Sequence, residues 1–400
     1  MRTRPLAEDG ALAVVSERDP ERLGALREEW RGLFDAAASP SPFLSWEWLH
    51  TWWSRFGGRR RPWLLEVRDR TGRLAGALAL ASLPGVAGVR RWQLVGNGLG
   101  GADGLDALVR ADVAPAARAA LARALADALP DWDALRLEDL PCGSPTVAAL
   151  GEALRPRGVR LAVERGFVCP GFAIRGSFEE HVRRVRRRET YGRRVRWLAR
   201  QPGFRIDVAT TPEEAHPAVE DFLRLHRLRW AEEGGSYGIP PGPLEDFHRE
   251  VAPRLAERGW LRLYRLHVDG KVIAAVYGIE LGRRFYYYQS GWDPAWSARS
   301  PGMVLVGRTV EDAYARDLTD YDFLRGTEAY KLDWAGDRRE TCTVRLRAPS
   351  LRAAAAAGAE EAWRAARGLA RSVAPERVWD TLRRVRRGLQ IDAAAAARAR

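Results

Sequence analysis

Residues 63–77 read WLLEVRDRTGRLAGA, and residues 260–275 read WLRLYRLHVDGKVIAA. Both stretches describe a strand, a tight turn that contains aspartate and glycine, and a second strand of small and apolar residues. Glycine supplies the positive φ that such a turn needs at little steric cost. The copies lie about 200 residues apart, a spacing that fits a repeated domain and not a solenoid repeat. The sequence therefore predicts two copies of one α/β unit, only one of which needs to retain its chemistry.

The composition fits a folded chain of two or three domains that attracts anions. The chain has 400 residues, of which 46% are hydrophobic and 16 are tryptophan, so packed cores are expected. The formal net charge is +13, and nearly all of the positive charge comes from arginine. This balance favours phosphates, nucleotides, acidic glycans, RNA or a lipid surface as partners. The alternative is that the arginines only reflect a GC-rich coding sequence.

Cysteine and histidine usage argues against a metal centre. Cys142, Cys169 and Cys342 lie far apart, without the spacing of a disulfide framework or a zinc site, and the 6 histidines show no metal-binding spacing. The first ten residues lack the apolar core of a signal peptide, and no apolar run reaches the roughly 18 residues of a membrane span. We expect no metal and a location in the cytoplasm or at the periphery of the inner membrane.

The hydrophobic pattern predicts an alternation of strands and helices in two units followed by a tail. The first unit (residues 1–165) is expected to contain strands at 11–15, 91–95, 134–138 and 158–163, and helices at 19–34, after 42–48, at 114–129 and at 147–154. The second unit (residues 166–348) is expected to contain a helix opened by a capping box at Ser177, helices at 212–232, 244–257 and 302–316, and strands at 204–209, 284–290, 319–324 and 341–347. Residues 349–400, rich in alanine and arginine, are expected to form an exposed helical tail.

The best local candidate for a binding site follows the aromatic strand at residues 284–290. The segment Arg299-Ser300-Pro301-Gly302-Met303-Val304 places serine, proline and glycine in the first turn of a helix. Proline there loses no hydrogen bond, and Gly302 lets an anionic group approach the backbone, where free N–H groups and the helix dipole form an anion site. The alternative is an ordinary capped helix. A second glycine-rich stretch at 96–101 lacks the lysine of a P-loop and is interpreted as a turn or a substrate-side loop.

The order of helices, hairpin, strand, anion-binding turn, helix and strand resembles the GNAT N-acyltransferase family. In that family, the loop after the fourth strand follows Arg/Gln-x-x-Gly-x-Gly/Ala and holds the pyrophosphate of an acyl-CoA. Here Arg299 and Gly302 match the pattern, whereas Val304 departs from it. The resemblance implies acyl-CoA as the co-substrate and implies that its binding residues are Gln289, Ser290, Arg299, Ser300, Gly302 and Met303.

Further motifs look like the GNAT-like acyltransferases of the CelD type, which take part in cellulose and exopolysaccharide biosynthesis. These motifs are residues 43–48, the Asp103/Asp106 pair, and residues 226–230, 288–294 and 321–334. The resemblance spans roughly residues 11–348. More distantly, the chain is similar to the Fem-type aminoacyl transferases that build peptidoglycan bridges and consist of tandem GNAT units. The expected fold is therefore α/β, with two GNAT-like units, each a mixed, mostly antiparallel sheet flanked by helices.

The reaction that the resemblance implies is acyl transfer to an amine or hydroxyl, which needs a base for the incoming proton and an acid for the leaving thiolate. An exposed N–H of the fourth strand can stabilise the oxyanion. Near the cleft, Glu328 is the candidate base, Tyr330 the candidate acid, and Asp322 a base or orienting group. Their structural alternatives are a loop carboxylate, a core tyrosine with a hydrated hydroxyl, and a partner of a neighbouring arginine. The candidates for substrate binding are Lys331, Arg325, His226, Trp230 and Arg187.

The helix that opens the second unit is dense in arginine between residues 181 and 200. Like charges at i and i+4 repel, so a negatively charged ligand would stabilise it. The functional interpretation is a grip on a nucleotide-sugar, a lipid pyrophosphate or tRNA, and the alternative is a solvated surface. Aromatic residues are sparse there, which argues against a stacking platform for single strands.

These observations together predict an acyl-CoA-dependent N- or O-acyltransferase that acts on a cell-envelope or polysaccharide precursor. The second unit would bind acyl-CoA, and the first would help to form the acceptor groove. One alternative is a Fem-like transferase that uses aminoacyl-tRNA. Another is a non-catalytic GNAT-fold scaffold that binds an anionic partner, which the Val304 departure favours weakly.

Overall fold

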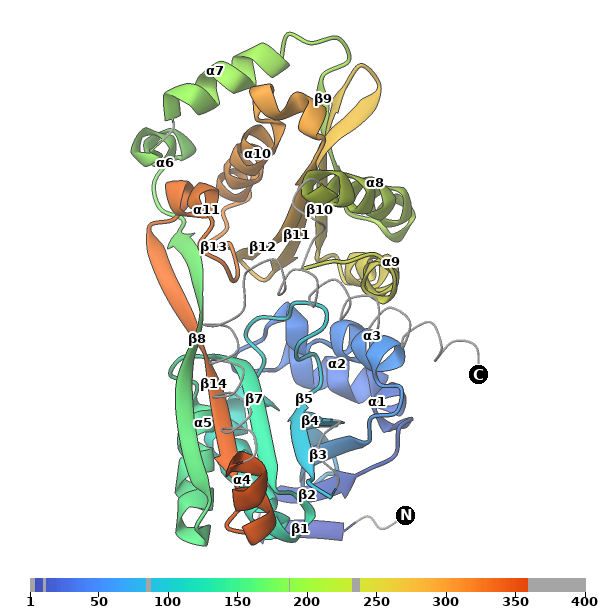
Figure 1. Ribbon diagram of the computed structural model, residues 1–400, viewed down its shortest axis with the longest axis vertical. Coiled ribbons are helices and arrows are strands. Elements are labelled where there is room, and N and C mark those ends of the chain that lie inside the picture. The colour runs from blue at the N-terminus through green and yellow to red at the C-terminus, as the bar shows by residue number, and fades with distance from the viewer. Residues whose placement is uncertain (1–3, 10–11, 84–87, 187, 232–237, 359–400) are drawn as a thin grey trace, which may run out of the picture.

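The computed structural model describes residues 4–9, 12–83, 88–186, 188–231 and 238–358, and shows two α/β units joined by one continuous sheet (Figure 1). The strands are β1 (Arg4–Asp9), β2 (Leu12–Glu17), β3 (Pro62–Asp69), β4 (Leu74–Leu83), β5 (Arg91–Leu94), β6 (Leu108–Val109), β7 (Ala134–Pro141), β8 (Arg160–Ala173), β9 (Arg205–Ala209), β10 (Leu261–Val268), β11 (Lys271–Leu281), β12 (Arg284–Trp292), β13 (Asp320–Asp322) and β14 (Asp337–Arg347). The helices are α1 (Arg22–Ala25), α2 (Arg27–Asp35), α3 (Trp46–Phe56), α4 (Ala114–Asp127), α5 (Pro145–Leu154), α6 (Phe178–Arg184), α7 (Arg188–Leu198), α8 (Pro212–Ala231), α9 (Pro243–Glu257), α10 (Pro301–Ala315) and α11 (Ala329–Trp334).

The two units repeat the same strand order. In the first unit the order is β2-β3-β4-β5-β7, and in the second it is β9-β10-β11-β12-β13. In each unit the last two strands of this series, β5 with β7 and β12 with β13, are parallel, whereas the other neighbours in the series are antiparallel. The predicted fold class, a mixed and mostly antiparallel sheet flanked by helices in two related units, is confirmed.

The repeated hairpins form as the sequence predicts. β3 pairs with β4 and β10 pairs with β11, and the register of each pair shifts near the turn. Gly72 and Gly270 adopt positive φ values of 80° and 70°, the conformation for which glycine carries no Cβ penalty. Trp63 is fully buried, and Trp260 packs against Phe34 with ring centroids 5.2 Å apart.

The units exchange their closing strands, which the sequence pattern did not predict. β8 leaves the first unit and pairs with β13 of the second, while β14 returns from the second unit to pair with β7 of the first. The two long strands also pair with each other, and Figure 1 shows them as a strap between the units. The expected strand at 158–163 is therefore only the start of β8, and the expected boundary at residue 165 falls within this strand.

Three further expectations differ in detail. The helix expected at 19–34 is divided into α1 and α2 at Leu26. The expected strand at 319–324 is confined to Asp320–Asp322. The start of the expected tail is mostly exposed, as predicted, but it is anchored to the first unit: Ala353 is buried in the first core and Arg352 pairs with the buried Asp133 at 3.0 Å. Residues 351–358 are helical, and the remainder of the tail lies outside the described residues.

Two apolar cores hold the units. The larger core fills the first unit and extends beneath α8 and α9 of the second, while the smaller core lies between the second sheet and α7 and α10. Across the units, Trp48 of α3 meets Phe247 of α9 edge to face at 5.0 Å, and Arg55 pairs with Glu250 at 2.6 Å. Aromatic pairs of this kind add about 0.5–1.5 kcal/mol beyond area burial, so α3 and α9 fasten the units on the side opposite the β8–β14 strap.

Candidate active site

In the second unit, the parallel strands β12 and β13 diverge. They pair only at Arg284–Tyr286 with Asp320–Asp322. β12 then continues to Trp292 along β11, while the chain after β13 turns toward β8 and the N–H of Phe323 donates to the carbonyl of Pro170 at 2.9 Å. The later residues of β12 therefore have no strand neighbour on the β13 side within the described structure. This divergence leaves an edge of the sheet that a ligand can occupy.

The open edge contains a bulge and an exchangeable hydrogen bond. The register between β11 and β12 shifts so that Tyr288 has no partner residue across the pair. The backbone N–H of Ser290 donates to the side-chain Oε1 of Gln289 at 3.1 Å. A bulge re-aims backbone groups beside a site. A ligand carbonyl that replaces the Gln289 oxygen would therefore accept from the same N–H.

The N-terminus of α10 lies at the end of β12 and is built differently from other serine-capped helices of this chain. Ser45 and Ser177 accept hydrogen bonds from N–H groups of the helices they precede, but Ser300 makes no such cap and adopts a left-handed conformation (φ 52°). A Cβ on Gly302 would lie 3.1 Å from Cδ1 of Trp292. The first turn of α10 thus presents N–H groups with no side-chain cap.

Arg299 is oriented by a residue of another helix. Its guanidinium lies over the indole of Trp197 in α7 at 4.0 Å from the ring centroid. Trp197 and Arg299 are both partly exposed. A cation–π contact at an exposed site contributes about 0.5–1 kcal/mol, which is enough to bias the side chain toward one orientation beside α10.

Val304, which departs from the family pattern, does not occupy this site. Its side chain is 2% exposed and belongs to the second core. Met303 is half-buried beside the same core, at the opening turn of α10. The larger residue at 304 is therefore accommodated on the inner face of α10.

Hydroxyl groups gather on the inner side of the divergence. Burial raises the pKa of Tyr287 to about 12, and the nearby hydroxyls of Ser290 and Tyr330 oppose this rise. The Tyr287 hydroxyl itself makes no hydrogen bond within the described structure. The rings of Tyr287 and Tyr330 are 6.1 Å apart. Burial raises the pKa of Tyr330 well above its ordinary value, and Tyr287 and Glu328 add to the rise. Both phenols therefore stay protonated at neutral pH and can donate protons.

The segment after β13 forms a network of ion pairs between the units. The backbone N–H of Arg325 donates to Asp103 at 2.8 Å, its Nε donates to the same carboxylate at 2.5 Å, and its Nη2 lies 3.1 Å from Asp139. Lys331 is buried, donates to the carbonyl of Arg325 at 2.6 Å and lies 3.1 Å from Glu328. These contacts fasten the loop after β13 to the loop that follows β5 in the first unit.

Residues 185–332 match the acetyltransferase (GNAT) domain family. The matched segment runs from the end of α6 to α11 and includes β9–β13, so it covers the divergent strands and the N-terminus of α10. The similarity to the GNAT domain family thus lies within the second unit. No curated protein matches the chain.

Solved structures share the fold across both units. The crystal structure of FemX has 12% sequence identity and a TM-score of 0.56, covering 79% of this chain and 95% of that chain. A conserved protein of unknown function from Bacteroides thetaiotaomicron has 14% identity and a TM-score of 0.51, covering 81% and 97%. L-PGS from Bacillus licheniformis has 12% identity and a TM-score of 0.50, covering 82% and 91%. At these identities the likeness establishes the fold alone.

The predicted catalytic residues separate into two places. Tyr330 and Glu328 lie at the inner side of the GNAT divergence with Ser290. Asp322 lies toward the other unit, where it accepts from the N–H of Leu324 at 2.9 Å and from Arg339 at 2.8 Å. Burial raises the pKa of Asp322, and the nearby Arg339 opposes that rise. The pairing with an arginine is the structural alternative that the sequence left open.

The predicted substrate-binding residues also divide. His226 is buried on α8, and a Cβ on Gly291 of β12 would collide with the backbone nitrogen of His226. Burial lowers the pKa of His226 to about 4, and Arg227 and Arg229 add to the effect. The ring centroids of Trp230 and His226 are 6.4 Å apart, and the guanidinium of Arg229 lies over the rings of both Trp230 and Trp292. This pair therefore lies at the α10 end of β12.

The other substrate-binding candidates lie elsewhere. Lys331 and Arg325 belong to the interface network, so their predicted contact with substrate competes with existing ion pairs. Arg187 lies outside the described residues. The roles of all predicted site residues stay predictions.

Sequence reasoning missed Tyr287 and Trp197 as site residues. Tyr287 stands inside the tyrosine triplet of the aromatic strand, and the sequence analysis assigned no role to it. Trp197 lies in the arginine-dense stretch, about 100 residues before Arg299, and no local pattern connects the two. The only sequence signal for Trp197 was its position within the arginine-rich stretch.

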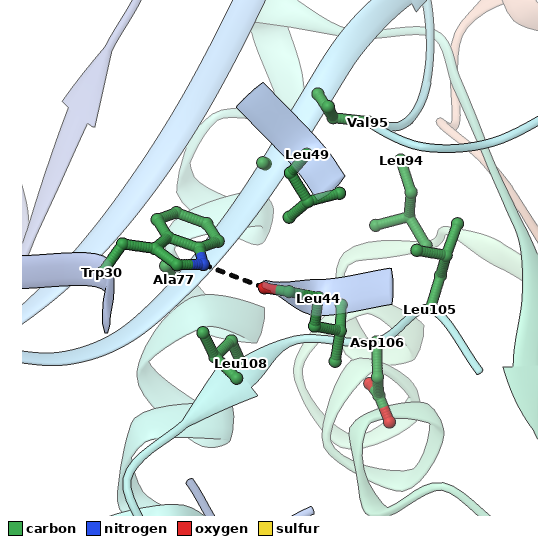
Figure 2. Close-up of a pocket in the computed structure, with 10 residues that line it drawn as sticks. Trp30, Leu44, Leu49, Ala77, Leu94, Val95, Leu105, Asp106 and Leu108 are labelled. Carbon is green, nitrogen blue, oxygen red and sulfur yellow. Dashed lines mark hydrogen bonds between the residues drawn. The ribbon is translucent and has the colours of Figure 1, made fainter. Parts of the chain in front are cut away.

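The corresponding place in the first unit is closed. β5 ends at Leu94, and β6 pairs with Gly76 and Ala77 of β4, where β12 would continue in the second unit. Figure 2 shows the resulting small cavity, with Trp30 donating to the carbonyl of Leu44 at 2.9 Å. The cavity measures about 10 Å³ and has an almost wholly apolar lining, Asp106 apart. It holds at most about one water molecule.

Within the described ranges, no cluster of three or more histidine, cysteine, aspartate or glutamate side chains could hold a metal ion. The same residues contain no helix that is both long and apolar enough to cross a bilayer.

Proposed function

We propose that the chain is an acyl-CoA-dependent acyltransferase that transfers an acyl group to an amine or hydroxyl of a cell-envelope or polysaccharide precursor. The observation that carries this proposal is the divergence of β12 and β13 next to the uncapped N-terminus of α10. An open sheet edge can pair with the extended, amide-containing arm of CoA, and a helix N-terminus can hold its diphosphate. Arg299, Ser300, Gly302 and Met303 surround that terminus.

The proposed chemistry uses groups on both sides of the divergence. The acceptor nitrogen or oxygen attacks the thioester carbon, and the N–H of Ser290 stabilises the developing oxyanion once the acyl oxygen replaces Gln289 Oε1. Glu328, whose side chain is 50% exposed, receives the acceptor proton. The C–S bond then breaks, and Tyr330 returns a proton to the thiolate of CoA, supported by Tyr287.

A groove between the units at the start of β12 is the proposed site for the part of the acceptor remote from Ser290, which lies near the other end of this strand. It has a volume of about 550 Å³ and is lined by residues of both units, among them Phe34 and Asp35 of the first and Trp260, Arg284 and Tyr286 of the second. Its mixed aromatic and charged lining suits a glycan or an amino-sugar. We place the reaction at the cytoplasmic face of the inner membrane, and the envelope-type acceptor rests on the resemblance to CelD-type proteins.

Calorimetric titration with acetyl-CoA and with a long-chain acyl-CoA tests the proposal. We expect micromolar binding by the native chain and a loss of at least about 100-fold in the Gly302→Leu variant, because the new side chain displaces Trp292 and covers the first turn of α10. Gly336→Leu is the control, since a Cβ there meets no atom within 4 Å. Unchanged affinity in Gly302→Leu, with both variants folded by circular dichroism, would overturn the donor site.

A second candidate is transfer from aminoacyl-tRNA. The observation that favours it is the basic surface of α6 and α7, where arginine side chains are abundant and exposed. RNA binding that weakens steeply with salt, without affinity for CoA, would support this candidate. Absence of both activities would support a non-catalytic scaffold.

A further inference from the structure

The arginines of α6 and α7 differ from most others in this protein. In the body of each unit, arginines pair closely with carboxylates, such as Arg22 with Glu66 at 2.6 Å and Arg265 with Asp207 at 2.9 Å. Within the described chain, no ion pair with a carboxylate forms at the arginines of the two basic helices and of the turns that follow them, which are Arg183, Arg184, Arg186, Arg188, Arg193, Arg194, Arg196 and Arg200. This surface therefore carries concentrated positive charge that is not paired with a carboxylate of the described residues.

Packing fixes how α7 lies on α10. A Cβ on Gly307 of α10 would collide with the ring of Tyr191 of α7, so glycine permits close approach there. Nearer the C-terminus of α7, Trp197 meets Arg299, which precedes α10. The earlier residue of α7, Tyr191, contacts the later residue of α10, Gly307, and the later residue of α7, Trp197, contacts Arg299 just before α10. The two helices are therefore antiparallel. The C-terminal end of α7 thus lies beside the N-terminus of α10.

Three of the free arginines share the face of Trp197. Arg193 precedes Trp197 by four residues and Arg194 by three, positions that are neighbours on a helix surface. Arg200 lies in the turn just after α7, where its N–H donates to the carbonyl of Trp197 at 3.2 Å. Arg193 and Arg200 are exposed, and Arg194 is half-buried with an unpartnered Nε. Arg299 links this face to the uncapped first turn of α10, because its guanidinium lies over Trp197 and it precedes α10.

We propose that Arg193, Arg194 and Arg200 bind the 3′-phosphate of the adenosine end of CoA. The inference rests on the proposed function, because it assumes that the diphosphate of CoA lies at α10. From there the ribose and its 3′-phosphate extend outward, and the α7 face is the cationic surface next to that terminus. Guanidinium groups bind phosphate through paired N–H donors that match its oxygens.

A nucleotide end fits this surface better than an RNA strand does. Tracks for single strands combine positive charge with successive exposed aromatic rings. On α7, Tyr191 is buried against α10 and one side of Trp197 is covered by Arg299. The surface is therefore suited to one phosphate monoester, and competition by RNA is an outcome that would contradict the assignment.

Comparison of CoA with dephospho-CoA, which lacks only the 3′-phosphate, tests the assignment by calorimetry. We expect the native chain to bind CoA about tenfold more tightly, since hydrogen bonds to charged groups contribute about 1.5–3 kcal/mol. The double variant Arg193→Gln/Arg200→Gln should bind both ligands equally, with its affinity for dephospho-CoA unchanged. Arg183→Gln on α6 removes one charge outside this face and should retain the preference.

The outcomes separate the inference from the proposed function. Equal native affinities for CoA and dephospho-CoA would overturn the inference and leave the proposed function standing. Binding of neither ligand would overturn both. A preference for CoA over dephospho-CoA that survives in the double variant would overturn the assignment. Loss of this preference in Arg183→Gln as well would show that it arises from general electrostatic attraction, and would also overturn the assignment. Competition for CoA by a single-stranded RNA at equal affinity would also contradict it.

Discussion

The two units have the same strand order but differ in the first strand of their parallel pair, which is β5 in the first unit and β12 in the second. In the second unit, β12 stays paired with β11 from Arg284 to Trp292, apart from the bulge at Tyr288. In the first, β5 stops after Arg91–Leu94, and the chain makes an excursion before it returns as β6 on the same neighbour. One unit therefore keeps an open edge, whereas the other fills the corresponding space with leucine and valine (Figure 2).

The excursion of the first unit serves the second unit. Tyr288 of β12 donates to the carbonyl of Gly100 at 2.5 Å, and Asp103 holds Arg325. The indole N–H of Trp52 donates to the carbonyl of Leu99 at 2.8 Å. The two copies of a repeated fold can thus have different roles, because the topology alone leaves open whether the divergent edge is vacant or occupied. The side chains that enter this space determine whether it can bind a ligand.

The largest effect should come from enlarging the filled space of the first unit. Leu105 is 1% exposed and lines the cavity. We expect Leu105→Ala to lower the free energy of unfolding by about 2–5 kcal/mol, as for other buried leucines, and to leave the affinity for acyl-CoA unchanged. Denaturant unfolding and calorimetry measure the two quantities.

Leu99, in the same excursion, provides the matched control because it is 41% exposed. Leu99→Ala should change stability by less than about 0.5 kcal/mol. A loss of acyl-CoA affinity in Leu105→Ala as large as that expected for Gly302→Leu would contradict the division of work between the units.

A somewhat smaller effect is expected from the hydroxyl cluster of the second unit. Tyr330→Phe should lower kcat about 100-fold, because general acid catalysis contributes about 10²–10⁴-fold, while the Kd for acyl-CoA stays constant. Steady-state kinetics with a thiol-detecting reagent and calorimetry give the two values. Tyr314→Phe, on α10, removes a partly buried phenol remote from Ser290 and should retain full activity; equal losses in both variants would argue against Tyr330 as the acid.

The smallest effect concerns pH and the interface. Burial raises the pKa of Asp139 to about 6, although Arg325 opposes the rise. Because the folded state holds this proton more tightly than the unfolded state, ionisation of Asp139 should cost stability as pH rises from about 4 to 6, with no further change above. The free energy of unfolding of the native chain minus that of the Asp139→Asn variant should therefore fall as pH rises over this range. Asparagine tolerates the positive φ of 62° at this position, so the comparison isolates the charge; a rising or flat difference would contradict the assignment.

Much of the second unit could be predicted from the sequence, because its elements carry local signals. The capping box at Ser177 forms as predicted, with Ser177 Oγ accepting from the N–H of Glu180 at 3.2 Å. α10 begins at Pro301, at the predicted turn. Ordinary rules of helix capping and hairpin turns were sufficient for these elements.

The extension of β8 beyond the predicted strand at 158–163 escaped prediction for a physical reason. Most of its first eight residues are exposed, so the strand shows no apolar alternation beyond Val163. Its pairing with β14 joins residues about 170 positions apart, and such non-local contacts leave no periodic trace in either segment. The interface network of Asp103, Asp139 and Arg325 depends on the same long-range arrangement.

The sequence by itself determined the two hairpins, the mixed α/β class and the Pro301-Gly302 first turn of α10, since each rests on contacts between near neighbours. Only the tertiary structure decided that the units exchange β8 and β14, that the first cleft is filled, and that Trp197 orients Arg299. Those features arise from packing between side chains that are distant in the sequence. Local propensity does not determine them.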